Sequence, residues 1–600
     1  MSVTSPLTSA RSISTPTSYE TGRNSSHEAD ITGISSPVAD DCFKGPRYRP
    51  AERPVRELSG QCNIQLEEEL YLPTILLLDN LLTDGTAPLG LKIAPPGRVP
   101  PPPQLAFLNT LTIHPSYTSR SPNTTNLHVA ARALAFLRGV LELAGPVNAN
   151  FRSAFIFRRP TRYRESRRGA RYDSSPCISS YSSSDTEGLE GRLANEQSIW
   201  RRGTDFWSVL GWAFRCASSY PERWRHWQVW LEYMVQVLEK DWDDRKAMDL
   251  NEEGIEEGQE SPDWKWLNLR ESLLVIYLED LKRDRKDVLK EVMRALMAFT
   301  VEDTVDSKVY QEVFERELAP PPGKSKRKRA ATAGEPEPEE FKSLADWALD
   351  EDFGSEDEDE GIPGSPTPRR RTTIRIKTTG RKPGRPRITT SPKAQSFKVS
   401  DSMTETVLLR LRLFRLLSAA AAWIPDLSFQ VDDLYHTFTE RVCTAPLPMF
   451  RVFIDSLPFA YNIDSFIHVS LLRHFAEKLL THKRPDPEDI EPDIKGGIPP
   501  MVVAKCFLPY AADRVMVEEN AKVSLVLDSM AWYIYRNAEE ITPEEVKQLG
   551  SAVGKGIKAR EDKIKKRNAG LTAADREARE ILDRSTRSLR VFVQVLEASR

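Results

Sequence analysis

Apolar side chains recur at the spacing of an amphipathic α-helix in three separate blocks of this 600-residue chain. The blocks are residues 64–145, 200–318 and 401–600, and very little of their sequence alternates between apolar and polar residues as a strand does. We therefore expect an all-α fold, either an irregular helical solenoid or a stacked helical bundle, interrupted by long disordered segments. No fixed-period repeat points to a named repeat family.

Several helix boundaries can be predicted from single residues. Pro221 suits the first turn of a helix, because its missing N–H needs no partner there. Thr542 precedes Pro543 and stands three residues before Glu545, which is the capping-box pattern of a helix start. Thr572 and Asp575 predict the start of the last helix in the same way.

Nine of the twelve tryptophans lie between residues 200 and 318. Trp224, Trp227 and Trp230 could form a platform for a cation or a base. Aromatic residues at helical spacing more often belong to a core, so we expect these side chains to be buried.

The segments between the helical blocks have a different composition. Residues 1–63 are rich in Ser, Thr, Pro and Gly and predict a disordered tail, because they offer little apolar area to bury. Residues 146–199 predict an Arg/Ser-rich flexible insertion. Within them, residues 152–171 carry eight arginines with interleaved aromatic residues, which suits either single-stranded nucleic acid or a plain flexible insertion. Residues 319–400 predict a disordered linker with separate acidic and basic parts.

The most specific motif lies in the basic part of this linker. It reads Arg381, Lys382, Pro383, Gly384, Arg385, Pro386 and Arg387. Glycine allows the backbone to approach the floor of a DNA groove, and proline keeps the next residues extended. The arginines can then lie along a narrow, strongly negative minor groove.

This motif resembles the AT-hook, a short element that binds the minor groove of AT-rich DNA. The resemblance implies that Arg385 and Arg387 insert into the groove while Arg381 and Lys382 contact phosphates. It covers about ten residues and occurs once, and Ile388 follows it where stronger examples continue with basic residues. We therefore expect weak, salt-dependent binding to AT-rich double-stranded DNA. A basic linker without specific binding is the alternative.

Other signals surround the motif. A compact basic cluster of the kind that a nuclear-import receptor binds consists of Lys324, Lys326, Arg327, Lys328 and Arg329. Residues 335–360 contain thirteen Asp/Glu against one Lys, and residues 362–400 contain eleven Lys/Arg and no Asp/Glu. Thr367 and Ser391 each precede a proline and are candidate phosphorylation sites, where a phosphate would weaken DNA binding.

Catalytic and membrane signatures are absent from the sequence. It has no P-loop, dinucleotide-binding glycine motif, GxSxG, HExxH or CxxC, and His468 and His474 are not spaced to share one helical face. The apolar runs are shorter than the roughly 20 residues that span a bilayer. We therefore expect no cofactor, no metal, no membrane association and no small-molecule substrate.

Together these features favour a nuclear, non-enzymatic scaffold or adaptor. It would bind nuclear protein partners through its helical body and chromatin through the AT-hook-like motif. The alternative is a protein-interaction subunit of a nuclear complex, in ribosome biogenesis or the cell cycle, without specific DNA binding. A helical enzyme with an unrecognised site is the third possibility.

Overall fold

A computed structural model describes most of the three helical blocks. The described residues are 48–84, 96–121, 123–158, 188–252, 266–298, 310–319, 399–459, 465–491, 497–538, 541–565 and 573–598. They all fall in the unit that spans Gly45–Arg600. Helices account for nearly all of their regular structure, so the predicted all-α fold is confirmed.

The first helices pack mainly on one another, with both α2 and α3 against α4. Two-residue strands β1 (Ala51–Glu52) and β2 (Gly97–Arg98) pair in parallel and form the only sheet among the described residues. The other elements of this part are α1 (Arg56–Glu67), α2 (Tyr71–Thr83), α3 (Pro102–Ile113), a 3₁₀ turn (Pro115–Tyr117), α4 (Thr124–Leu143), α5 (Phe151–Ala154) and α6 (Ile199–Arg202).

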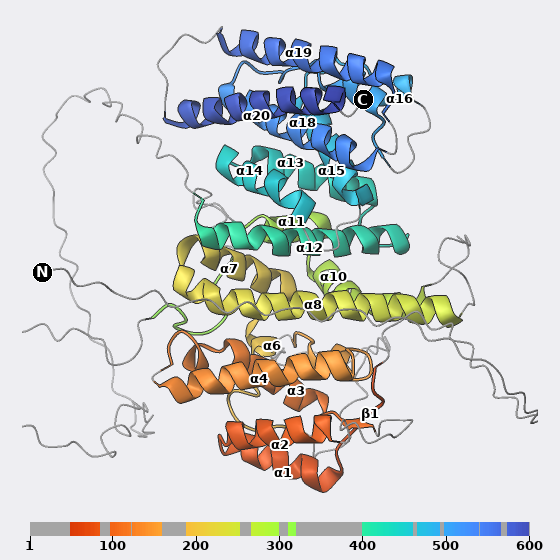
Figure 1. Cartoon of the computed structure of the whole chain (residues 1–600). Helices are drawn as coiled ribbons and strands as arrows, with labels where there is room; N and C mark the ends of the chain where they lie inside the picture. Colours follow the sequence, from red (N-terminus) through yellow and green to blue (C-terminus); the bar gives the residue numbers. More distant parts are fainter. Residues whose placement is uncertain are drawn as a thin grey trace, which may run out of the picture. The chain divides into compact units, whose positions relative to one another are not determined.

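The longest described helix is α8 (Pro221–Glu252), and it contacts elements from all three sequence blocks. It begins at Pro221, as predicted. Around it lie α3, α7 (Phe206–Ser219), α9 (Leu267–Arg270), α10 (Leu273–Asp284) and, from beyond residue 398, α12 (Asp401–Trp423). Helix α11 (Val288–Leu296) packs on α7. Figure 1 shows α7, α8 and α12 side by side.

The last block continues the same pattern, with α18 packed against α14, α15 and α20. Its elements are α13 (Val431–Thr444), α14 (Leu447–Ser456), a 3₁₀ turn (Leu457–Phe459), α15 (Ser465–Leu479), α16 (Pro487–Ile490), α17 (Pro500–Val502), a π-helix (Val503–Phe507), α18 (Val517–Asn537), α19 (Pro543–Lys565) and α20 (Ala573–Ala598). The capping box is confirmed, because the Thr542 N–H donates to Glu545 Oε2 at 2.8 Å and the Glu545 N–H donates to Thr542 Oγ1 at 3.4 Å.

One continuous hydrophobic cluster runs through all three blocks. Trp224, Trp227 and Trp230 are fully buried in it, so the expectation of a tryptophan core is confirmed. The indole N–H of each of these three tryptophans has a partner, as an apolar interior requires. Trp230 Nε1, for example, donates to Asn109 Oδ1 at 3.0 Å.

Two boundaries differ from the sequence-based expectation. Helix α1 begins inside residues 1–63, which were expected to be a disordered tail, and Tyr48 donates a 3.1 Å hydrogen bond to Asp244 on α8. In the expected insertion 146–199, Phe155 and Phe157 lie in the core. Both stretches lack helical periodicity, yet a few large side chains attach them to the helical body.

Candidate functional site

The residues singled out in the linker lie outside the described part of the chain. This holds for the AT-hook-like motif from Arg381 to Arg387, for the basic cluster from Lys324 to Arg329, and for Thr367 and Ser391. What the structure does describe is how each end of segment 320–398 joins the helical body.

The segment starts beside a buried carboxylate, Glu317, which is 2% exposed. Glu317 Oε1 accepts hydrogen bonds from Arg223 Nε at 2.5 Å and from Trp227 Nε1 at 2.7 Å. Both donors lie on the first turns of α8. A buried carboxylate is tolerated only when such partners satisfy it, so these bonds fix the chain just before residue 320.

The segment ends at the start of α12, close to the same part of α8. Ser400 caps α12, accepting from the Met403 N–H at 3.3 Å. One turn further, Glu405 Oε2 accepts from Trp224 Nε1 at 3.0 Å. Because Trp224 and Trp227 are neighbours on α8, segment 320–398 leaves and rejoins the body at one helix.

Helix α12 is joined to α11 through Arg410, whose side chain is completely buried. Its guanidinium donates to the carbonyls of Leu296 and Ala298 at the C-terminal end of α11 and lies 3.9 Å from the centre of the Phe214 ring. Burial lowers the pKa of Arg410 to about 9. The arginine therefore acts as a cap for α11 supplied by another helix.

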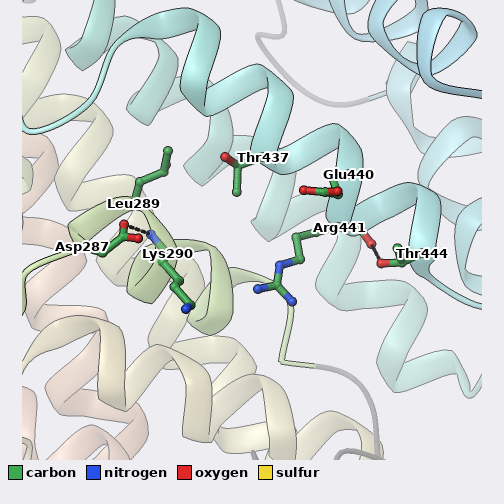
Figure 2. A pocket seen from close by; sticks show the side chains of 7 residues that line it. All are labelled: Asp287, Leu289, Lys290, Thr437, Glu440, Arg441 and Thr444. Carbon is green, nitrogen blue, oxygen red and sulfur yellow. Dashed lines mark hydrogen bonds between the residues drawn. The ribbon is translucent and has the colours of Figure 1, made fainter.

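A solvent-open cleft of about 390 Å³ lies between α11 and α13 (Figure 2). We call it the basic cleft. Helix α11 and the residue before it contribute three side chains, and α13 contributes four. The lining residues are Asp287, Leu289, Lys290, Thr437, Glu440, Arg441 and Thr444.

The two cations of the basic cleft have no carboxylate partner among the described residues. Figure 2 shows Lys290 and Arg441 extending into the same space from opposite walls. The two carboxylates of the lining make contacts with other groups. Asp287 caps α11 by accepting from the Lys290 N–H at 3.0 Å, and Glu440 pairs with Lys478 at 3.4 Å.

The turn that leads into α11 adds further positive charge. Lys282, Arg285 and Lys286 are exposed and make no ion pair within the described ranges, whereas Arg283 pairs with Asp280 at 3.1 Å. The turn and the basic cleft therefore form one surface with net positive charge. We refer to the two together as the basic surface.

A second hollow, of about 360 Å³, lies near the α1–α2 junction. Its walls include the carboxylates of Glu67, Glu69 and Glu190 and the buried residue His114. Glu67 Oε1 accepts from the Glu190 N–H at 2.7 Å, which ties the chain after residue 187 to α1. Burial, aided by the nearby charge of Arg223, lowers the pKa of His114 to about 4.

The arginine-rich stretch 152–171 is only partly described, up to residue 158. Phe155 stacks on Trp200 with ring centres 5.0 Å apart, and Phe157 packs against the same indole. Arg152 pairs with Glu271 at 2.6 Å. These two aromatic residues are part of the core and are not available to stack on bases.

The histidines of α15 also have packing roles. The His468 ring meets Tyr533 edge to face, and burial lowers its pKa to about 4, whereas the His474 ring packs near Tyr435. Across the ranges that the structure covers, no group of three or more His, Cys, Asp or Glu is placed to hold a metal ion. None of the described helices has the length and apolar character to cross a bilayer.

The sequence matches no known family model, and a search of curated proteins finds no match either. The function is therefore inferred from the sequence and geometry of this chain. Sequence reasoning missed the basic cleft, because its two walls are about 150 positions apart. The one local signal was the run of basic residues from Lys282 to Lys286.

Proposed function

We propose that this protein is a nuclear, non-enzymatic scaffold that attaches partner proteins to AT-rich DNA. The observation that carries the proposal is the double attachment of segment 320–398 to α8, through Glu317 at one end and Glu405 at the other. The segment is therefore an insertion within one helical body and not a linker between two separate domains.

This attachment supports a tethering role on physical grounds. A weak DNA-binding element gains effective strength when a short tether keeps it close to other binding surfaces. Residues 362–400 contain eleven Lys/Arg and no Asp/Glu, so the AT-hook-like motif lies in an uncompensated cationic stretch. Counterion release from DNA favours the binding of such a stretch.

Binding of the full-length chain to AT-rich and GC-rich duplexes tests the DNA part of the proposal. We expect tighter binding to the AT-rich duplex, and we expect the double variant Arg385→Ala, Arg387→Ala to lose that preference. The matched control is Arg369→Ala, Arg371→Ala, which removes the same charge from the same segment outside the motif. It should weaken binding to both duplexes equally. Equal binding of the unmodified chain to both duplexes would contradict the proposal.

The cluster of Lys324, Lys326, Arg327, Lys328 and Arg329 is proposed to direct nuclear import. Deletion of residues 324–329 should move a fluorescently labelled full chain to the cytoplasm. Deletion of residues 332–337, which carry no basic residue, is the control and should leave the label in the nucleus. A nuclear signal that survives deletion of the cluster would remove it from the proposal.

A protein-interaction subunit without specific DNA binding is the second candidate. It is favoured by two large aromatic residues that the body leaves in solvent, Phe459 at 80% and Phe466 at 57% exposure. Exposed aromatic residues are costly in isolation and common at protein interfaces. Under this alternative, deletion of residues 362–398 would leave the set of co-purifying proteins unchanged and AT preference would be absent.

A further inference from the structure

We propose that the basic surface, formed by the basic cleft and the turn before α11, binds the phosphate backbone of the same duplex that the AT-hook-like motif engages. This inference rests on the proposed function and adds a second DNA contact, made by the folded body itself. It concerns described residues, whereas the motif lies in segment 320–398.

The charge distribution is the first argument. The basic surface carries five cationic residues without an ion pair in the described part of the chain, Lys282, Arg285, Lys286, Lys290 and Arg441, against the three acidic residues Asp284, Asp287 and Glu440. Its net charge is therefore positive. The whole chain has slightly more acidic than basic residues, 87 against 84, so carboxylate partners are not scarce. Neighbouring like charges repel one another, and a polyanion relieves that repulsion.

The chemistry of the lining residues favours phosphate over an acidic peptide. Thr437 and Thr444 line the basic cleft together with Lys290 and Arg441, and the Thr444 hydroxyl donates to the Arg441 carbonyl at 2.8 Å. Lys, Arg, Ser and Thr are typical phosphate contacts in protein–DNA interfaces. Leu289 is the one aliphatic residue in the lining and is half-buried. An acidic peptide would need apolar anchor sites as well, and the basic cleft does not offer them.

The arrangement of the cations also suits the successive phosphates of a DNA backbone. Lys286 lies in the turn just before α11 and Lys290 lies in the first turn of that helix, so both cations belong to the start of α11. Arg441 reaches the same space from α13 (Figure 2). Asp287 already caps the N-terminus of α11, so the side chains, and not the helix end, supply the attraction.

Chain length permits both contacts at once. Arg387 lies thirteen residues before Ser400, a span of up to roughly 40 Å when extended. Arg410 lies about 15 Å along the axis of α12 from its start, and its guanidinium bonds the C-terminal end of α11. The basic surface lies at the other end of α11, about 13 Å further. A duplex held by the motif can therefore reach the basic surface.

The test compares two triple variants of the full-length chain. Lys286→Gln, Lys290→Gln, Arg441→Gln neutralises three cations of the basic surface. Lys547→Gln, Lys555→Gln, Lys558→Gln is the matched control, because these three lysines are exposed on α19 and also have no ion pair within the described ranges. Affinity for AT-rich and GC-rich duplexes is measured between about 50 and 200 mM salt.

We expect the basic-surface variant to lower the slope of log affinity against log salt by about 2 to 3, since each lost phosphate contact removes about 0.9. The loss should be equal on both duplexes, so the preference for AT-rich DNA remains. The α19 control should keep the wild-type slope. Circular dichroism should show unchanged melting for both variants, because all six side chains are solvent-exposed.

An unchanged slope for the basic-surface variant overturns the inference, as does an equal loss in the α19 control. Loss of binding to an acidic protein with an unchanged DNA slope also overturns it and assigns the surface to that partner. Failure of the AT-hook proposal is seen separately. In that case the wild-type chain shows no AT preference, while the two triple variants still report on the basic surface.

Discussion

Buried polar side chains hold distant parts of this chain together. Glu317 is the clearest example, because Oε2 of the same carboxylate also accepts from Trp212 Nε1 at 3.2 Å and from the Phe314 N–H at 3.3 Å. Removing one partner of such a network leaves a buried charge unsatisfied, which costs about 3 to 5 kcal/mol. The network therefore attaches residues 310–319 to α7 and α8.

His114 should make the protein sensitive to mild acid. Its pKa in the folded protein is about 4, below the ordinary 6.5, because burial and the charges of Arg223, Arg120 and Arg202 disfavour the protonated ring. Above pH 6.5 the ring is neutral in both the folded and the unfolded protein. As pH falls from 6.5 towards 4, the ring becomes protonated in the unfolded protein but not in the folded one, so the free energy of unfolding decreases. The shift from 6.5 to about 4 is about 2.5 pKa units, which corresponds to about 3 kcal/mol.

Urea unfolding of the wild type and of His114→Phe near pH 7 and near pH 4.5 measures this contribution. The variant should lose about 2 kcal/mol less stability on acidification than the wild type. His436→Phe is the control, because His436 is an exposed histidine. The comparison between variants is needed because Asp244 and Asp528, whose pKa values are raised to about 6 by burial, act in the opposite direction. Equal acid sensitivity in wild type and His114→Phe would contradict the assignment.

At the level of elements, the sequence predicted helices best where a boundary residue and an apolar face agreed. Helices α8 and α19 begin where Pro221 and the Thr542 capping box placed them. The start of α1 was missed, because before residue 64 this helix buries only Cys62 and Asn63, one of which is polar. Apolar residues continue at helical spacing from Trp266 to Leu281, but the structure has two helices there, α9 and α10, because Ser272 starts α10 by accepting from the Val275 N–H at 3.4 Å.

The basic cleft could not be predicted for a different reason. Periodicity describes one helix at a time, and the cleft exists only because α11 and α13 meet in the folded chain. The role of Arg410 could not be predicted for the same reason. The sequence shows a single arginine on an apolar helix face, but not that its guanidinium donates to the carbonyls of Leu296 and Ala298 on another helix. The AT-hook-like motif, in contrast, can be recognised from local sequence alone and stays a prediction.

Two glycines of α19 give a matched pair of substitutions. A Cβ added at Gly556 would collide with the backbone carbonyl of Leu508, whereas one added at Gly554 would meet nothing within 4 Å. Gly554→Ala should therefore stabilise the helix by about 0.5 to 1 kcal/mol, the usual gain over glycine. Gly556→Ala should destabilise the protein by about 1 to 3 kcal/mol, because α19 must move away from residue 508.

Thermal unfolding followed by circular dichroism distinguishes the two variants. The melting temperature should rise for Gly554→Ala and fall for Gly556→Ala. Equal shifts in both variants would show that α19 does not pack closely against the chain at Leu508.

For the unit as a whole, the important property is that one core continues across segment 320–398. Helices before the segment, α7 and α8, pack directly on α12, which follows it. The hydrophobic cluster includes Phe214 from one side and Phe414 from the other. The two halves of the chain should therefore fold as partners and not as independent domains.

Cutting the chain within the segment tests this directly. With a specific protease site inserted after Gly361, the cleaved fragments should elute together in size-exclusion chromatography under native conditions, because the apolar area between α7, α8 and α12 holds them. In denaturing urea the fragments should separate. Separation under native conditions would contradict a shared core.

The attachment of segment 320–398 near Trp224 and Trp227 also has a mechanical consequence. When a duplex bound to that segment is pulled, the force is shared between the two ends of the segment. Both ends transmit it to neighbouring turns of α8. Resistance to such a pull would come from α8, where Trp224 and Trp227 are fully buried.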